Sequence, residues 1–242
     1  MRKLLRILGV VGLTAVVLMA VSSVSNLVLG AYETANIHPY GQRVSIDGGQ
    51  VNVSVTGDGE KTMVLMAHSL AGIYSLDYVN RFPGEVSALV TIDGTVPEDF
   101  AVAPKTDGWA RFLSTTGWVR WLTALDPAIA APSAPDGVYS ERDIEQIRLM
   151  TIRNYANPAA IDENNRSAEN FAAVGGLAYP TGLPVLAFVS RQLIDANTEW
   201  LPAHAQQLES LNRSELVVLD GGHYLHWTHS REMAEHLSRF LG

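Results

Sequence analysis

The chain has 242 residues, of which 47% are hydrophobic, 17% are charged and none is cysteine. This composition excludes a disordered chain and leaves enough apolar material for one main domain and a membrane segment. Because no thiol is present, disulfides, thiolate nucleophiles and cysteine-based zinc sites are excluded. The formal net charge of −8, without a stripe of Lys or Arg, argues against nucleic acid as a partner.

The first thirty residues have the character of a membrane or targeting segment. Three basic residues, Arg2, Lys3 and Arg6, precede an uncharged and mostly apolar run that continues to Tyr32. Such a run is typical of an uncleaved membrane span of roughly 20 residues or of a signal peptide that is removed after export. We favour a single span at residues 1–32, because no clear cleavage site follows the run. The basic residues stay on the cytoplasmic side, so the remaining chain is expected outside the cell membrane.

The segment after a polar linker predicts a β-hairpin. Residues 43–47 and 51–56 alternate in polarity on either side of Gly48-Gly49, which suits a tight turn. A second turn, at 57–60, leads into an apolar strand at 62–66. Because this turn is too short for a parallel crossover, we predict that 51–56 and 62–66 pair antiparallel, within a sheet of about six strands.

The elements that follow predict a mostly parallel sheet flanked by helices. The strand at 62–66, a helix over 70–82 and a buried strand at 86–92 have the strand–helix–strand order that gives parallel strands. The same pattern resumes near the end of the chain with two buried strands and an amphipathic helix, at 184–189, 215–219 and 231–241. The fold class is therefore α/β.

Residues 98–180 form a helical insertion in this frame, since they carry helical patterns and several prolines and nothing that alternates like a strand. We therefore expect an α/β core made of residues 40–97 and 181–242 and a helical cap at 98–180. The cap carries three tryptophans that we expect to pack in its interior rather than to line a substrate site: Trp109, Trp118 and Trp121.

A serine stands between the strand 62–66 and the helix 70–82, within the sequence Ala67-His68-Ser69-Leu70-Ala71-Gly72. On such a sharp turn the hydroxyl is held outward, and small neighbouring residues let strand and helix pass closely. The start of the helix supplies N–H groups and the positive end of a dipole to a developing oxyanion, and the N–H of Leu70 is the first donor. The other interpretation is that Ser69 only caps the helix.

A serine becomes nucleophilic only with a base beside it. His223 is the candidate, because it follows the strand 215–219 and a Gly-Gly turn and directly precedes the last helical segment. We expect its ring within hydrogen-bond reach of the Ser69 hydroxyl. His226 and His229 follow at intervals of three, but no carboxylate completes a set of ligands, so we expect no metal.

Together these features resemble the α/β-hydrolase fold family. The resemblance rests on the hairpin, the serine elbow, the strand that ends in Ile92-Asp93-Gly94, the helical insertion and the segment 221–227, and it covers residues 40–242. The chain is similar to bacterial members with an N-terminal membrane segment and a helical cap, which implies an esterase-like serine hydrolase without a cofactor. The resemblance makes Ser69 the nucleophile, His223 the general base and the Leu70 N–H part of the oxyanion hole.

The resemblance offers two carboxylates as the acid that orients the histidine. Family members usually carry it a few residues after the strand at 184–189, where Asp195 is the first carboxylate. A few members use the end of the preceding strand, which here is Asp93. We expect Asp195, with Asp93 as the alternative acid or as a turn residue.

The chain departs from the family pattern just before the elbow. Family members carry two more strands and two helices there, with a loop that donates the second oxyanion N–H, whereas eleven residues separate Gly57 from Ser69. Two functions follow: a serine hydrolase that acts on an ester through an acyl-enzyme, or a shortened, weakly active or inactive homologue that binds a ligand. The apolar cap favours an uncharged or lipid-like ester as the small-molecule partner.

Overall fold

The computed structural model describes residues 1–37, 41–55, 63–97, 107–130 and 138–242. The chain divides into two compact units, residues 1–56 with 104–164 and residues 57–103 with 165–242. This division differs from the expected core and cap in two respects. The hairpin belongs to the same unit as the N-terminal helix, and helix α7 (Ser167–Val174), expected in the cap, belongs to the unit that contains the sheet.

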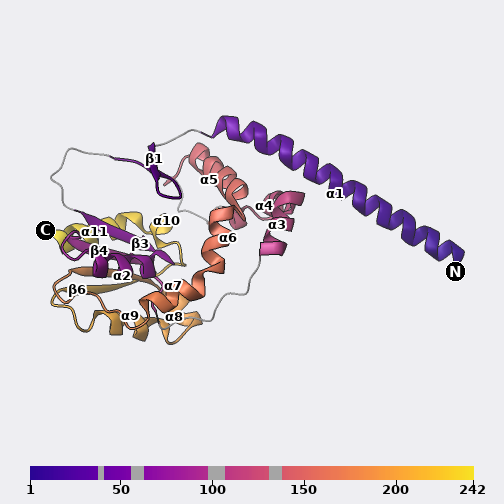
Figure 1. Ribbon diagram of the computed structural model, residues 1–242. Coiled ribbons are helices and arrows are strands. Elements are labelled where there is room, and N and C mark those ends of the chain that lie inside the picture. Colours follow the sequence, from indigo (N-terminus) through magenta and orange to yellow (C-terminus); the bar gives the residue numbers. More distant parts are fainter. Residues whose placement is uncertain (38–40, 56–62, 98–106, 131–137) are drawn as a thin grey trace. The chain divides into compact units, whose positions relative to one another are not determined.

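The second unit contains a parallel sheet between helices, as predicted (Figure 1). This sheet has four strands. The strand order is β3-β4-β5-β6, and every neighbouring pair is parallel. The strands are β3 (Val64–His68), β4 (Ala88–Ile92), β5 (Val185–Ser190) and β6 (Ser214–Leu219). Besides α7, the helices are α2 (Ala71–Arg81), α8 (Arg191–Ala196), α9 (Trp200–Leu208), α10 (Leu225–Thr228) and α11 (Ser230–Leu241).

The two central strands supply residues to two apolar cores. Leu89 and Ala187 belong to the core formed with α2, α7 and α9. Val90 and Phe188 belong to the other core, which contains residues of α10 and α11. Successive side chains of a strand point to opposite faces of the sheet, so β4 and β5 are buried on both sides. This is why both strands are continuous apolar runs in the sequence.

The prediction about strand β3 is wrong. Among the described residues, β3 pairs in parallel with β4 at the edge of its sheet, and β2 (Gly49–Val53) pairs only with β1 (Gln42–Ile46). The turn 57–60 lies outside the described residues. The prediction assumed a strand buried on both faces, yet Val64 is only half-buried and Met66 is 51% exposed. Such a strand fits a sheet edge. The six strands of the described residues form two sheets instead of the single sheet that was predicted.

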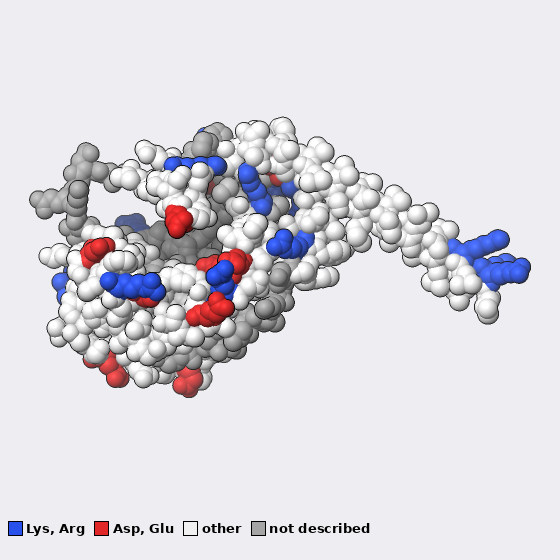
Figure 2. Space-filling view, viewed as in Figure 1, with Lys and Arg blue, Asp and Glu red and all other residues white. Residues whose placement is uncertain are grey.

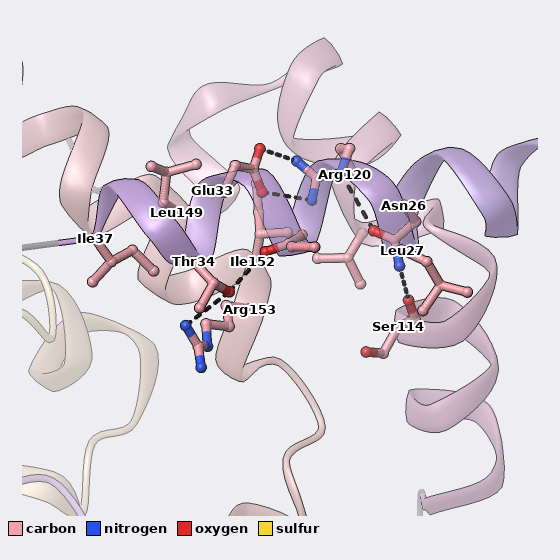
Figure 3. Close-up of a pocket in the computed structure, with 13 residues that line it drawn as sticks. Asn26, Leu27, Glu33, Thr34, Ile37, Ser114, Arg120, Leu149, Ile152 and Arg153 are labelled. Atoms are coloured by element: carbon pink, nitrogen blue, oxygen red, sulfur yellow. Dashed lines mark hydrogen bonds and ion pairs between the residues drawn. The ribbon is translucent and has the colours of Figure 1, made fainter.

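The first unit contains the N-terminal helix α1 (Arg2–Asn36) and the predicted hairpin. Strands β1 and β2 are antiparallel, and Gly48 has a φ of +80° in the turn between them. The other helices of this unit are α3 (Asp107–Thr116), α4 (Trp118–Leu125), the 3₁₀ turn η1 (Pro127–Ile129), α5 (Glu141–Asn154) and α6 (Pro158–Asn165). A cavity of about 320 Å³ lies between α1 and the helices α3, α4 and α5 (Figure 3).

The second half of α1 is tied to the neighbouring helices by polar side chains. Ser22 and Asn26 donate hydrogen bonds of 2.6 and 2.9 Å to carbonyl groups near the end of α3. The guanidinium of Arg120 donates two hydrogen bonds, of 2.5 and 2.8 Å, to the carboxylate of Glu33 (Figure 3). The side chains of this pair are only 15% and 17% exposed. The second half of α1 is therefore an integral part of the unit.

Among the described residues, the first half of α1 has no such polar contacts with another helix. By length and composition α1 can cross a membrane, with a mean hydropathy of 2.4 in a stretch of which none is buried. Figure 2 shows basic side chains at its beginning and an uncharged surface beyond them. The three tryptophans of α3 and α4 are also exposed, by 67%, 48% and 58% for Trp109, Trp118 and Trp121. The expectation that they pack inside the cap is wrong, because the buried face of α4 consists of Val119 and Thr123.

Candidate active site

Ser69 lies directly after β3, at the turn into α2. Its φ of +55° is a left-handed conformation that costs a non-glycine residue on the order of 1–3 kcal/mol. Three backbone hydrogen bonds hold it: its N–H donates to the carbonyl of Ile92 over 3.2 Å, and its carbonyl accepts from the N–H groups of Gly72 and Thr95, both at 2.9 Å. This is the strained strand-to-helix turn on which a hydroxyl is presented as a nucleophile.

Gly72 allows the close approach that this turn needs. A Cβ atom at this position would lie 2.7 Å from the carbonyl oxygen and 2.9 Å from the nitrogen of Thr95. Both are backbone atoms, which cannot rotate away as the end of a side chain can. Glycine is therefore required where α2 passes the loop that follows β4.

The expected hydrogen bond between serine and histidine is present. His223 lies in the turn between β6 and α10, and its Nε2 is 2.8 Å from Oγ of Ser69. Both residues are half-buried. The hydroxyl can donate to Nε2 only in the tautomer whose proton is on Nδ1, and we assign this tautomer from the partner of Nδ1.

That partner is Asp93, whose Oδ2 accepts from Nδ1 of His223 over 2.7 Å. The carboxylate is fully buried, with an exposed fraction of 0%. Its second oxygen, Oδ1, accepts the backbone N–H of Ser190 at 3.0 Å and the indole N–H of Trp200 at 2.9 Å. A buried charge is tolerated only when it is paired and hydrogen-bonded, and three N–H groups meet this requirement here.

The structure thus places Asp93 against the histidine, and Asp195 elsewhere. Asp195 is an exposed residue of α8, so the geometry favours Asp93, the alternative acid, over Asp195. The register of the sheet explains the result: His68 of β3 pairs with Ile92 of β4, and the residues that follow them therefore lie side by side. We had followed the family's usual acid position and had not used the adjacency of the two strands.

Two residues around the carboxylate were missed by the sequence analysis. Ser190 ends β5, and its Oγ donates a hydrogen bond of 2.6 Å to the carbonyl of Gly221, in the turn that carries His223. The rule that sites form at the carboxyl ends of parallel strands could have pointed to it. Trp200 begins α9, and no signal in the sequence links its indole to Asp93, because that contact depends on how α9 packs.

Two further histidines pack near the relay. The ring of His68 is centred 4.7 Å from that of His223 and 4.5 Å from that of His226, and its Nε2 donates to the carbonyl of His223 over 3.0 Å. Burial lowers the pKa of His68, and the hydrogen bond to the carbonyl of His223 offsets only part of this effect. Burial and the two neighbouring imidazoles lower the pKa of His226 to about 4. Both rings are therefore neutral at neutral pH.

The structure also describes Leu70 and His229, which the sequence analysis considered as an oxyanion donor and as a possible metal ligand. Leu70 is the N-cap of α2, and among the described residues none accepts a hydrogen bond from its N–H. His229 lies next to Thr228, with Nδ1 and the hydroxyl 2.7 Å apart. Within the described part of the chain, no three His, Asp or Glu side chains are grouped as metal ligands.

This arrangement can move a proton from a serine to an imidazole whose other nitrogen faces a carboxylate. A hydroxyl, an imidazole and a carboxylate are joined by hydrogen bonds, and they occur in the chain order Ser69, Asp93, His223. The N–H of Leu70 lies at the positive end of the α2 dipole, where negative charge is stabilised.

Two solved structures resemble the chain in fold. A probable hydrolytic enzyme from Pseudomonas aeruginosa is 15% identical, with a TM-score of 0.50 over 75% of this chain and 64% of that one. A putative alpha/beta hydrolase from Nostoc is 12% identical, with a TM-score of 0.50 over 76% of this chain and 67% of that one. The chain thus spans about two thirds of the length of these proteins. Among curated proteins, none matches it.

The family assignment comes from a match to the alpha/beta hydrolase family. The family model covers residues 26–236, a range that includes Ser69, Asp93 and His223. The match extends over most of the chain and agrees with the parallel sheet of the second unit. The chain therefore belongs to the alpha/beta hydrolase family.

Proposed function

We propose that the protein is a serine hydrolase that cleaves an ester or related acyl substrate through an acyl-enzyme. One observation carries the proposal: Ser69, His223 and Asp93 form a continuous hydrogen-bonded relay with heavy-atom distances of 2.8 and 2.7 Å. These distances lie within the reach that general-base catalysis requires. A serine that only capped α2 would have no need of a histidine and a buried carboxylate behind it.

In the proposed reaction, Oγ of Ser69 attacks the acyl carbonyl carbon while its proton passes to Nε2 of His223. The imidazolium that forms is stabilised by the carboxylate of Asp93. The C–O bond to the leaving group then breaks, and the proton passes from Nε2 to the departing oxygen. In the second half, water attacks the acyl-enzyme with His223 again as base, and the acid product and free Ser69 are released. No cofactor takes part in these steps.

The proposed site has fewer hydrogen-bond donors for the oxyanion than the family pattern provides. The N–H of Leu70 and the start of α2 provide one donor and a favourable dipole. The family's second donor comes from a loop for which the eleven residues between Gly57 and Ser69 leave no room. Loss of one such donor lowers turnover by on the order of 10²–10³, so we expect slow hydrolysis. The short segment also favours a second candidate, a homologue that binds its ligand without turning it over.

We further propose that α1 is retained as a membrane anchor and that the chain after it lies outside the cell. The basic residues before the apolar run support this orientation. Retention is supported by the buried pair of Arg120 with Glu33, because removal of α1 would leave the guanidinium without its partner. A lipid-like or otherwise uncharged ester is the substrate class that we propose for a hydrolase held at a membrane.

The nucleophile is tested with purified full-length protein, a fluorophosphonate probe and a short-chain p-nitrophenyl ester. Ser69→Ala should abolish labelling and hydrolysis, whereas Ser210→Ala, which changes an exposed serine, should change neither. Thermal stability of Ser69→Ala should stay within about 1 kcal/mol of wild type, since the change removes little packing. Labelling without hydrolysis in wild type would favour the binding homologue. Undiminished labelling of Ser69→Ala would end the serine-hydrolase proposal.

A further inference from the structure

Helix α4 presents a large apolar surface to solvent. Trp118, Trp121, Leu122 and Leu125 follow the spacing of one helix face, and they are exposed by 48%, 58%, 38% and 84%. We call these four residues the tryptophan face. The side of α4 that is buried consists of Val119 and Thr123. A helix that is apolar on both sides normally has a partner on each, and within the described residues only the buried side is covered.

The tryptophan face carries no charge. Arg120 is the single charged residue of α4, and its guanidinium is turned to Glu33 and Asn26 on α1 (Figure 3). Within α4, the tryptophan face therefore has no group for an ion pair with a protein partner. Two tryptophans beside leucines on an uncharged surface are typical of the boundary between lipid headgroups and acyl chains.

The position of α4 along α1 fits that boundary. Ser22 accepts the indole N–H of Trp121 at 3.0 Å and donates to the last residue of α3, and Asn26 binds the same end of α3. From Ile7, the first residue after the basic cluster, to Asn26 is about 28 Å along a helix. The hydrocarbon core of a bilayer is about 30 Å thick. The contacts that fix α4 to α1 therefore lie where the apolar span ends.

We propose that the tryptophan face is a membrane-binding surface that lies in the outer headgroup boundary of the bilayer crossed by α1. The inference rests on the proposed anchoring by α1. The apolar surface of α1 up to Val21 and the tryptophan face would form one lipid-contacting surface, with α4 lying along the interface as monotopic amphipathic helices do. The interaction holds α3 and α4 at the membrane surface and opposes sliding of α1 through the bilayer.

The absence of cysteine makes site-directed spin labelling the direct test. Single cysteines replace Leu125 on the tryptophan face, Leu13 in the apolar half of α1, and Arg142, an exposed residue of α5. Each full-length variant is reconstituted into phosphatidylcholine–phosphatidylglycerol vesicles. Collision of the label with oxygen, which concentrates in lipid, is compared with collision with a water-soluble nickel complex. Leu125→Cys changes a side chain that is 84% exposed, so the fold is retained.

The expected result is an oxygen-to-nickel collision ratio that is several-fold higher for labels at positions 125 and 13 than at position 142. A lipid signal at position 13 with a water signal at position 125 would overturn the membrane-binding face and leave the anchor standing. A water signal at position 13 would overturn the anchor and this inference with it. Low collision with both reagents at position 125, with dipolar broadening between labels, would assign the face to a second copy of the chain and overturn the proposal.

Discussion

Replacement of Asp93 by Asn separates the proposed catalytic acid from its rival. The two side chains have nearly the same shape, so the buried site is not opened. The amide oxygen can keep the hydrogen bonds that Oδ1 accepts from Ser190 and Trp200. The amide NH₂ then faces Nδ1 of His223, from which the carboxylate accepted a hydrogen bond before. Because NH₂ is a donor, Nδ1 must become an acceptor, and the imidazole proton moves to Nε2.

The expected loss of activity follows from this change of tautomer. With a proton on Nε2, the imidazole cannot accept the hydroxyl proton of Ser69. An imidazole held in the wrong tautomer in this way lowers kcat by roughly 10⁴-fold. This loss corresponds to an increase of about 5 kcal/mol in the activation free energy. The loss of one charge-assisted hydrogen bond should lower the free energy of unfolding by no more than about 3 kcal/mol. The variant should therefore be folded and nearly inactive.

Initial rates of p-nitrophenyl ester hydrolysis and the rate of fluorophosphonate labelling measure this effect, and circular dichroism checks the fold. Asp195→Asn is the matched control, because it makes the same chemical change in an exposed residue of α8. It should leave kcat unchanged and stability within about 0.5 kcal/mol. The reasoning is refuted if Asp93→Asn retains kcat within tenfold of wild type, or if Asp195→Asn loses it.

Two further predictions concern stability. Gly72→Ala should lower the free energy of urea unfolding by about 1–3 kcal/mol, because its Cβ would lie 2.7 Å from a backbone oxygen. Gly182→Ala is the control and should not lower it, since a Cβ there would have nothing within 4 Å. Equal effects of the two changes would contradict the close approach at the elbow. The free energy of unfolding should fall as pH drops from 6.5 to 4, since the unfolded chain protonates His226 at its ordinary pKa of 6.5 and the folded chain only near 4. Between pH 6.5 and pH 4 the melting temperature of His226→Gln should decrease less than that of wild type. An identical decrease in both proteins would show that His226 does not contribute to the pH dependence of stability.

The parts of the fold that were predicted correctly are those where a local pattern determines the outcome. β5 is buried along its whole length, so its apolar run was visible in the sequence. The turn at Gly48 and the start of α2 beside Ser69 follow from local backbone preferences. The hydrogen bond between Ser69 and His223 was expected for the same reason, because each residue stands at a recognisable junction between elements.

The errors concern choices that depend on which segments become neighbours. Asp195 was preferred because of its distance along the chain from β5, whereas the pairing of β3 with β4 brings Asp93 beside the turn of Ser69. The strand β3 was expected to need two neighbours, yet its residues tolerate an edge. The tryptophans of α3 and α4 were taken as core because large aromatic residues are usually buried. Their exposure is what the proposed membrane-binding surface would require.

The supports of the relay explain how it is formed in a chain that is so short before the elbow. Ser69 and Asp93 are both held in left-handed conformations, with φ of +55° and +46°, at the ends of adjacent strands. The hydrogen bonds from the N–H of Ser69 to Ile92 and from Thr95 to Ser69 join these two turns into one local structure. The turn of His223 is tied to it through Ser190 and His68. Every one of these residues follows the start of β3, so a short segment between Gly57 and Ser69 removes none of them. Among the groups of the proposed site, we expect the short segment to affect the oxyanion donor, and for this reason we expect the serine to react with a probe even where turnover of an ester is slow.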